Sequence, residues 1–281
     1  MTPLVFRRSV VIVGLSLAAA GVLFWAATLR AGHRSADSDP WTDAEPAGTT
    51  EPAVVVAELF TSEGCSSCPA ADEVLRRLVR EPFGNTVVLG LGEHVDYWNH
   101  LGWRDPFSSP AFSSRQSEYQ GVFRTNSIYT PQLVVDGQFE AVGSDVPAVR
   151  RALASAARLP KAAIDVSASP VDDGRLTVRL RFGLPKGLAL RERADVLIGL
   201  TQDALTSDVR RGENRGRTLT HSAVVRTLTT LGSLQPPAAT FAKTVAVPLG
   251  ADWDIHTLKV IALLQERHSR RIVGAGSAPI S

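Results

Sequence analysis

The stretch "AVVVAELFTSEGCSSCPAADEVLRRLVR" (residues 53–80) decides the fold that we predict for this chain of 281 residues. It opens at residues 53–60 with an apolar run, interrupted by Glu58, that is typical of a strand buried on both faces. Residues 65–80 then have the spacing of an amphipathic helix. Pro69 falls in its first turn, where a missing N–H costs no hydrogen bond. A buried strand therefore leads through a short turn into a helix.

Strand and helix patterns continue after this stretch. Residues 86–91 predict a second buried strand, which makes the unit βαβ with two parallel strands. Residues 131–143 predict a β-hairpin that turns at Asp136-Gly137, a dipeptide suited to tight turns. Residues 145–159 predict an alanine-rich helix. The first half of the chain therefore has the pattern of an α/β protein.

A long insertion, residues 92–128, separates the second predicted strand from the hairpin, and a helix is predicted over 109–123. Loops of this length in compact domains are usually functional or disordered. The many aromatic residues of the insertion indicate a folded segment. We expect it to lie beside the cysteines described below, with Trp98, Trp103 and Arg115 in contact with a substrate. Alternatively, Arg115 forms an ion pair within the insertion.

From residue 161 onwards the apolar residues alternate with polar ones. No helical pattern occurs between the strands that this alternation predicts. The predicted strands are 163–169, 175–182, 194–202, 219–231, 241–249, 258–265 and 271–277. A series of short strands of this kind predicts a separate, small antiparallel β-sandwich at residues 161–281.

The composition excludes several classes of protein. Apolar residues make up 44% and charged residues 21% of the chain, as expected for a protein that buries a core. The formal net charge of +2 is too small to indicate a nucleic-acid-binding protein. Two cysteines cannot form the disulfide framework of a small secreted scaffold. We identify no motif for a cofactor and predict that none is bound.

The amino terminus predicts export from the cytoplasm. Residues 9–29 contain no charged side chain, which is long enough for a helix to span a bilayer. Arg7 and Arg8 precede this run and predict that the amino terminus stays inside. We therefore expect a signal anchor at residues 1–30, or a cleaved signal peptide, followed by a disordered linker at 31–52. The remaining chain is expected in the cell envelope, held at the inner membrane or secreted, where disulfides persist.

Both cysteines of the chain, Cys65 and Cys68, lie at the junction of the first strand and the first helix. The N–H groups and dipole at a helix amino end stabilise a thiolate and lower its pKa. Such a thiolate attacks a partner disulfide, and a second cysteine then resolves the mixed disulfide. This position predicts that Cys65 attacks and that Cys68 resolves. Exported proteins with thiols or disulfides are the expected partners.

Two other interpretations of the cysteine pair remain open. The pair closes a very short loop as a structural disulfide, in which case the stabilisation from loop entropy is small. In the other interpretation the two thiolates bind zinc or copper(I) together with His94 and His100. Under either interpretation the protein is a binding module or a metal-handling factor rather than an enzyme.

The order of the predicted elements resembles the thioredoxin-like fold, in which a cis-proline opens the third strand opposite the cysteines. Thr130-Pro131 occupies that place in this chain. The chain is also similar to the domain-of-unknown-function family 1223, which comprises exported proteins of bacteria without an assigned activity. The segments that carry this similarity are "ELFTSEGCSSCPAADEVL" (58–75), "HVDYWNHLGWRDPFSSPAFSSRQSEY" (94–119) and "YTPQLVVDG" (129–137).

The resemblance implies an α/β fold class, with a thioredoxin-like domain at residues 53–160 followed by the antiparallel β-sandwich. It implies that Cys65 and Cys68 are the redox pair. It also implies that Thr130 and Pro131 face this pair through a cis peptide bond. For exchange chemistry we further expect the sulfur of Cys65 to be accessible to solvent.

Three acidic or imidazole side chains are candidate proton relays for the cysteine pair. Glu58 lies in a strand that is otherwise apolar, and His94 and Asp96 follow the end of the second strand. Each has an alternative structural role, as a strand-edge carboxylate or as a hydrogen-bonding partner of the insertion. A turn rich in arginine and glycine, "RRGENRGR" (210–217), is expected to be solvated or to contact an anionic surface.

Overall fold

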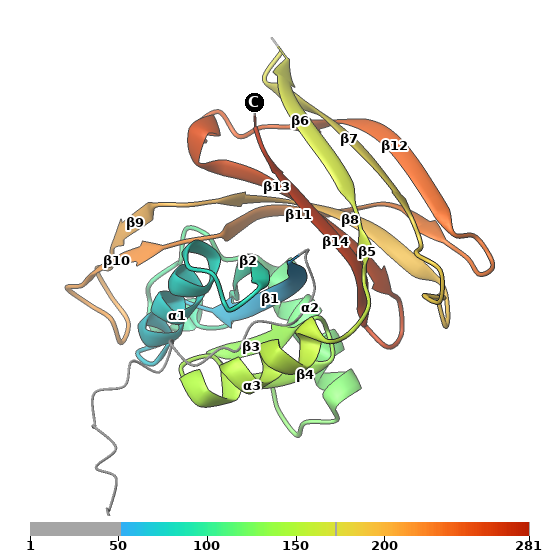
Figure 1. Cartoon of the computed structure of the whole chain (residues 1–281). Coiled ribbons are helices and arrows are strands. Elements are labelled where there is room, and N and C mark those ends of the chain that lie inside the picture. Colours follow the sequence, from blue (N-terminus) through green and yellow to red (C-terminus); the bar gives the residue numbers. More distant parts are fainter. Residues whose placement is uncertain (1–51, 172, 281) are drawn as a thin grey trace, which may run out of the picture. The chain divides into compact units, whose positions relative to one another are not determined.

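The structure, a computed structural model, describes residues 52–171 and 173–280. The predicted signal anchor (1–30) and nearly all of the predicted linker (31–52) lie outside these residues. Within the described part of the chain, strands outnumber helices (Figure 1). No helix in that part combines the length and the apolar character that are needed to cross a membrane.

The elements of the described residues are as follows. The α-helices are α1 (Cys68–Arg80), α2 (Pro110–Phe123) and α3 (Val146–Ala157), and short 3-10 helices lie at Asn99–Leu101 and Ile255–Thr257. The strands of the first half are β1 (Ala53–Thr61), β2 (Thr86–His94), β3 (Gln132–Val135) and β4 (Phe139–Val142). Those of the second half are β5 (Ala162–Ala163), β6 (Asp165–Val171), β7 (Arg175–Gly183), β8 (Ala194–Gln202), β9 (Leu205–Asp208), β10 (Thr218–His221), β11 (Val224–Leu234), β12 (Thr240–Pro248), β13 (Leu258–Glu266) and β14 (Ile272–Pro279).

One mixed sheet runs through both halves of the chain, in the order β4-β3-β1-β2-β11-β8-β13-β14-β5. The halves join where β11 pairs with β2 in parallel, with Val224 opposite Gly92. The N–H of Gly92 donates a hydrogen bond to the carbonyl oxygen of Ala223 at 2.7 Å. A Cβ on Gly92 would lie 3.3 Å from that oxygen, so glycine permits this close approach.

The predicted fold class, an α/β thioredoxin-like domain followed by a separate antiparallel β-sandwich, is wrong. The described residues are mostly strand, and β8, β11, β13 and β14 extend the sheet that β1 and β2 begin. Strands form at each position predicted after residue 161, but the predicted strand 219–231 is divided into β10 and β11, which lie in different sheets, and β9 was not predicted. Alternation identifies a strand, but it does not determine which strand becomes its neighbour. The prediction therefore missed the sheet that both halves share.

The helices cover the two faces of the first end of this sheet (Figure 1). Leu75 of α1 and Leu153 of α3 pack with Leu59 of β1 in one hydrophobic core. Phe112 of α2 packs on the opposite face, with Leu91 and with apolar residues of β8 and β13. The helix of the insertion therefore packs against strands from both halves.

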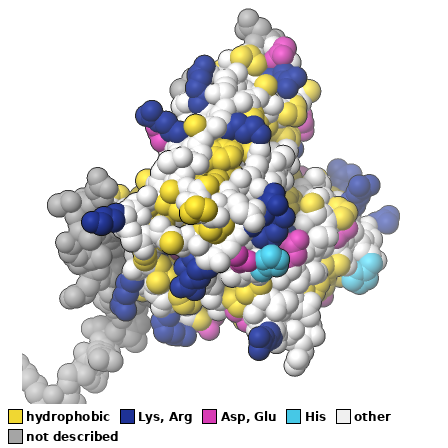
Figure 2. Space-filling view, turned by 90° about the vertical axis from the view of Figure 1, so that its right-hand side faces the viewer, with side chains coloured by type: hydrophobic (Ala, Val, Ile, Leu, Met, Phe, Trp, Pro, Cys, Tyr) yellow, Lys and Arg dark blue, Asp and Glu magenta, His cyan; other side chains and the backbone are white. Residues whose placement is uncertain are grey.

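A second, three-stranded sheet in the order β12-β7-β6 covers the far end of the large sheet. Its buried side chains Leu176 and Val178 pack against Ile198, Leu200 and Val260 of the large sheet. Figure 2 shows the molecule from the side of β12, with Lys and Arg side chains spread over the face rather than gathered in one patch.

The turn of the predicted hairpin forms a further contact between the halves. The N–H of Ile272 donates to the carbonyl oxygen of Asp136 at 2.9 Å, and the N–H of Val56 donates to Asp136 Oδ1 at 2.9 Å. Gly137 has a φ of +67°, and a Cβ there would lie 1.9 Å from the carbonyl oxygen of Arg270. Glycine is therefore required at this position both for its backbone conformation and for space.

Candidate disulfide-exchange site

Cys65 and Cys68 form a disulfide at the amino end of α1, with their Cα atoms 5.4 Å apart. The N–H of Cys68 donates to the carbonyl oxygen of Cys65 at 3.2 Å, which closes the turn before the helix. The helix begins at Cys68 and not at Cys65 as the sequence predicts, and Pro69 lies in its first turn. Cys65 therefore precedes the helix.

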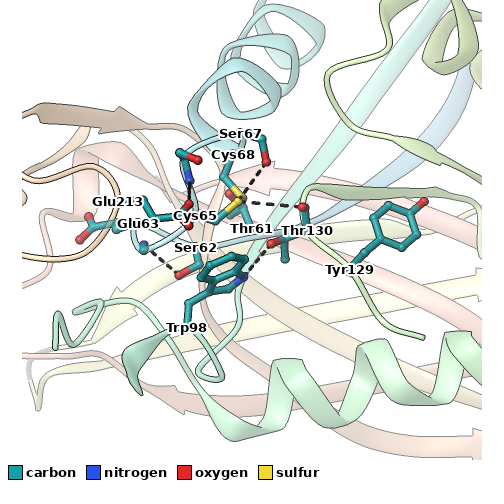
Figure 3. Close-up of a disulfide and its surroundings, with 12 residues drawn as sticks. Thr61, Ser62, Glu63, Cys65, Ser67, Cys68, Trp98, Tyr129, Thr130 and Glu213 are labelled. Atoms are coloured by element: carbon teal, nitrogen blue, oxygen red, sulfur yellow. Dashed lines mark hydrogen bonds between the residues drawn. A yellow bond between two sulfur atoms is a disulfide. The ribbon is translucent and has the colours of Figure 1, made fainter. Parts of the chain in front are cut away.

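The start of the β3–β4 hairpin faces the disulfide (Figure 3). The peptide bond between Thr130 and Pro131 is cis, as the resemblance implies. The sulfur of Cys65 lies 3.9 Å from the carbonyl oxygen of Thr130. Trp98 of the insertion donates a hydrogen bond from Nε1 to Thr130 Oγ1 at 2.7 Å. The disulfide, the hairpin and the insertion therefore meet at this site.

The expectation of a solvent-accessible sulfur is wrong in this structure. Cys65 is 1% exposed and Cys68 is 0% exposed, whereas Ser66 and Ser67 between them are exposed. The sulfur of Cys65 lies 3.4 Å from Ser67 Oγ and 3.9 Å from the carbonyl oxygen of Thr130, and it is bonded to Cys68. A segment from the second half of the chain also lies at this turn. Residues 209–217, which connect β9 to β10 and are named the β9–β10 loop below, bind the turn around Cys65.

The β9–β10 loop holds this turn through backbone contacts. Asn214, a buried residue, donates from Nδ2 to the carbonyl oxygens of Glu63 at 2.9 Å and Cys65 at 2.8 Å. The neighbouring Glu213 accepts a hydrogen bond from the N–H of Ser66 at Oε2, at 2.8 Å. Arg217 Nη1 donates to Asn214 Oδ1 at 2.8 Å and orients the amide. The loop therefore satisfies backbone groups on both sides of the disulfide turn.

The side chain of Glu63 lies buried beside this turn, in contact with residues from distant segments. Trp103 Nε1 donates to Glu63 Oε2 at 2.7 Å, and His221 Nε2 lies 3.1 Å from Glu63 Oε1. Glu63 is 0% exposed, so its charge requires these partners. Its carboxylate therefore belongs to a buried polar network.

Asp72 extends this network to the helix. It lies four residues after Cys68, and residues at this spacing share one face of a helix. Thr61 Oγ1 donates to Asp72 Oδ1 at 2.7 Å, and His221 Nδ1 lies 3.4 Å from Asp72 Oδ2. Burial lowers the pKa of His221, but the carboxylates of Asp72 and Glu63 outweigh burial and raise it to about 9. A charged imidazole therefore neutralises buried carboxylates close to the disulfide.

His94 lies in the same network through Asp105. His94 Nδ1 lies 2.7 Å from Asp105 Oδ2, which also accepts a hydrogen bond from the N–H of Glu63 at 2.9 Å. Burial raises the pKa of Asp105, but His94 and backbone N–H groups have the larger combined effect, and the pKa is lowered. The rings of His94 and His221 are 4.8 Å apart at their centroids.

The structure does not bring together the predicted metal ligands. His100 is exposed, and its Nδ1 lies 2.6 Å from the carbonyl oxygen of Tyr97. Cys65 and Cys68 are bonded to each other, and His94 is paired with Asp105. In the residues that the structure describes, no group of three or more His, Cys, Asp or Glu side chains is arranged to hold a metal ion.

Glu58 and Arg115 form a separate buried cluster between β1 and α2. Arg115 donates from Nε to Glu58 Oε2 at 2.6 Å, and Tyr119 donates its hydroxyl to Glu58 Oε1. Arg115 also lies 3.4 Å from Glu93 Oε1. Burial raises the pKa of Glu93 well above its usual value, and the charge of Arg115 opposes this increase. Arg115 is thus a buried ion-pair partner of Glu58 in β1 and of Glu93, which lies at the start of the predicted insertion.

Asp96 lies at α2, where Ser113 Oγ donates to Asp96 Oδ1 at 2.5 Å. The three candidate relay residues therefore have different surroundings. Glu58 belongs to the Arg115 cluster, His94 belongs to the network of Glu63, and Asp96 binds α2.

Sequence reasoning missed Asp72 and Asn214. The position of Asp72 four residues after Cys68 was a usable signal, but nothing local connects Asn214 to a turn 149 residues away.

The comparisons with known proteins support a family assignment. The family model described as "Protein of unknown function (DUF1223)" matches residues 56–265. A crystal structure of a protein from Agrobacterium tumefaciens is similar, with 30% identity and a TM-score of 0.60 over 82% of this chain and 95% of that chain. HBP35 of Porphyromonas gingivalis has 14% identity and a TM-score of 0.59 over 82% of this chain and 76% of that chain, a likeness of fold. No curated protein matches the chain. The chain therefore belongs to the DUF1223 family of proteins of unknown function.

Proposed function

We propose that this protein exchanges disulfides with thiols of other exported proteins through Cys65 and Cys68. The observation that supports the proposal best is the position of the disulfide. It lies at the amino end of α1, and the sulfur of Cys65 is 3.9 Å from the backbone carbonyl of Thr130. The helix end stabilises negative charge on a released sulfur. A backbone carbonyl next to the sulfurs offers a hydrogen-bond acceptor to an extended peptide.

The exchange proceeds in two balanced steps. A client thiolate attacks the sulfur of Cys65, a bond forms between the two, and the bond to Cys68 breaks with Cys68 leaving as a thiolate. A second client thiolate then attacks the client sulfur of the mixed disulfide and releases the Cys65 thiolate. The client loses two electrons and two protons and gains a disulfide. The Cys65–Cys68 pair takes up the two electrons and two protons and becomes two thiols. With an oxidised client and a reduced pair, the same steps run in reverse.

Access to Cys65 is part of this proposal because the sulfur is buried. Ser66 and Ser67 are exposed, so the turn itself reaches the surface. The β9–β10 loop is hydrogen-bonded to this turn, by Asn214 at the carbonyl oxygen of Cys65 and by Glu213 at the N–H of Ser66. We propose that exchange requires this loop to move away from the turn. Such motions of loops occur on time scales of nanoseconds to milliseconds.

The compartment belongs to the same proposal. The uncharged residues 9–29 favour export, and a disulfide between Cys65 and Cys68 persists outside the reducing cytoplasm. The proposed clients are therefore envelope or secreted proteins.

A second candidate function is a binding module in which the disulfide is only structural. The burial of both sulfurs favours this candidate, because an inert disulfide needs no access to solvent. Under it the contacts of the β9–β10 loop are permanent, and the pair resists mild reductants.

A trapping experiment tests the proposed function. The Cys68→Ala variant of the exported protein lacks the resolving cysteine, so mixed disulfides between Cys65 and client proteins should accumulate in cells. The matched Cys65→Ala variant retains only Cys68, the first residue of α1, which is 0% exposed, and it should trap little or nothing. Absence of mixed disulfides in both variants, with both proteins folded and exported, would favour the binding module.

A further inference from the structure

A hollow on the surface lies next to the disulfide turn. It has a volume of 720 Å³ and is lined by Leu101 of the insertion and by residues of the β9–β10 loop. The lining residues from that loop are Arg210, Arg211, Gly212, Glu213 and Arg215. The hollow is therefore formed by the same loop that is hydrogen-bonded to the disulfide turn.

The guanidinium groups of the hollow have no acidic partner. Arg210, Arg211 and Arg215 are exposed, and within the described residues none of them forms an ion pair or a side-chain hydrogen bond. The carboxylate of Glu213 is engaged by the N–H of Ser66. Arg217, which lies outside the hollow, is bonded to Asn214. Three positive charges therefore line the hollow, and its one carboxylate is already bound.

The hollow and the disulfide turn are in contact. A Cβ on Gly212 would lie 3.7 Å from the Cα of Gly64, the residue that precedes Cys65. On the other side of the disulfide turn, Ser66 is bonded to Glu213. A peptide lying in the hollow would therefore have its neighbouring residues at the turn that contains Cys65.

We propose that this hollow binds an acidic segment of the client polypeptide whose cysteine reacts at Cys65. Guanidinium groups bind carboxylates with two parallel hydrogen bonds, which makes arginine better suited than lysine to acidic peptides. Leu101 adds an apolar surface on which the stem of such a segment packs. This inference rests on the proposed function, and it names the class of client: proteins with Asp or Glu close to the reacting cysteine.

Binding in the hollow also acts on access to the disulfide. The arginines and the two residues that hold the turn, Glu213 and Asn214, belong to one short loop. A ligand that shifts the loop towards itself weakens the hydrogen bonds of Glu213 and Asn214 to the disulfide turn. The short loop cannot keep its position at the turn and follow the ligand at the same time. An acidic segment therefore promotes exposure of Cys65 at the site where the client cysteine arrives.

Binding of fluorescent peptides tests the inference directly. The protein with Cys65→Ser and Cys68→Ser cannot exchange disulfides and reports binding alone. We expect an acidic peptide to bind at least tenfold more tightly than a basic peptide of equal length, with an affinity that falls as salt increases. The variant with Arg210→Gln, Arg211→Gln and Arg215→Gln should lose this preference. The control variant with Arg151→Gln, Arg158→Gln and Arg179→Gln removes three exposed charges elsewhere and should retain it.

Equal binding of both peptides, or equal loss in the control variant, would overturn the inference. Binding of phosphatidylglycerol vesicles through the same three arginines, without binding of the acidic peptide, would identify a membrane surface as the occupant and would also overturn it.

Exchange rates separate this inference from the proposed function. The wild-type protein is reacted with dithiothreitol and with acidic and basic peptide dithiols. The inference is supported if the acidic peptide dithiol reacts faster than the basic one with the wild-type protein, and if the two rates become equal in the arginine variant. Reaction with dithiothreitol and equal rates for both peptides contradicts the inference but leaves the function intact. Reaction with no thiol at all contradicts the function, whichever peptide binds.

Discussion

Asn214 Nδ2 lies 2.8 Å from the carbonyl oxygen of Cys65 and donates a hydrogen bond to it across 149 residues of sequence. The same amide donates to the carbonyl oxygen of Glu63 at 2.9 Å. These bonds connect a loop of the second half to the turn that contains Cys65. The loop therefore holds the backbone of the disulfide turn, and the proposed access to Cys65 depends on the movement of this loop.

Replacing Asn214 should make the disulfide easier to reduce. In Asn214→Ala two buried carbonyl oxygens lose their donors, which costs about 1–3 kcal/mol. This cost weakens the covered conformation of the loop relative to the open one, and every 1.4 kcal/mol corresponds to a tenfold change in an equilibrium constant. We expect the rate of reduction by dithiothreitol to rise by about tenfold, measured by alkylation of the released thiols.

Thr218→Ala is the matched control for this variant. It removes the exposed hydrogen bond of 2.6 Å from Thr218 Oγ1 to Asp208 Oδ1. This bond joins β10 to β9, the two strands that flank the β9–β10 loop, and it lies away from the disulfide turn. Its reduction rate should stay within a factor of two of the wild type. An unchanged rate in Asn214→Ala would show that the loop does not limit access to Cys65.

The charge of His221 should make the stability depend on pH. The folded-state pKa of about 9 lies above the ordinary value of 6.5, so the protonated form stabilises the fold. This contribution is complete below pH 6.5, decreases as the pH rises, and is lost above pH 9. The shift corresponds to a change on the order of 3 kcal/mol. Urea unfolding between pH 6 and 10 measures it.

His221→Gln is the control, because a glutamine side chain keeps a hydrogen-bonding group but has no charge to lose. Its stability should be lower at pH 6.5 and should not fall in the same way towards pH 9. Parallel pH profiles of the two proteins would show that the pair of His221 with Glu63 and Asp72 is not ionic.

Arg115 should be essential for stability. In Arg115→Met the carboxylate of Glu58 loses an ion-pair partner at 2.6 Å and stays buried. Breaking a buried pair in this way costs about 3–5 kcal/mol. Arg181→Met removes an exposed pair with Asp165 and should cost less than about 1 kcal/mol. Thermal unfolding of both variants compares them, and an equally small effect would contradict the structural role of Arg115.

Gly137 should tolerate no side chain. In Gly137→Ala the new Cβ would lie 1.9 Å from the carbonyl oxygen of Arg270, so backbone must shift at a contact between the halves. We expect a loss of about 3–5 kcal/mol in the free energy of unfolding. Gly174 has a φ of +72° with no atom within 4 Å of its Cβ position, so Gly174→Ala isolates the conformational cost of about 1–2 kcal/mol. Equal losses in the two variants would show that the contact at Arg270 relaxes.

The sequence predicted the local elements of the fold well. The strand, turn and helix around Cys65 appear as expected, and so does the hairpin that turns at Asp136-Gly137. These elements depend on contacts between residues that are near in sequence, such as a proline in a first turn or a glycine with positive φ. Such local rules can be applied to one sequence.

The predicted division into two independent sheets failed because pairing between strands is not local. One further signal was available in β8 and β13. Both contain nearly continuous apolar runs, "VLIGL" and "VIALL", and every residue of each run is buried. Continuous runs are typical of central strands covered on both faces, not of an exposed small sandwich. The continuous runs of β8 and β13 therefore indicate a larger sheet.

The site was only partly predictable for the same reason. Cys65, Cys68 and Pro131 follow from their positions in a known order of elements. The turn at Cys65 is held by Asn214, and the charge near α1 depends on His221, both from distant segments. No periodicity or spacing within one sequence places a loop of the second half on the turn of the first.

The reduction potential of the Cys65–Cys68 pair tests the central claim most directly. It is measured by equilibration of the wild-type protein with glutathione or dithiothreitol buffers of known potential and by alkylation of the free thiols. Disulfide exchange predicts a value between about −270 and −120 mV, the range of proteins that oxidise, reduce or isomerise disulfides. A value more negative than about −300 mV is typical of structural disulfides and would contradict the claim.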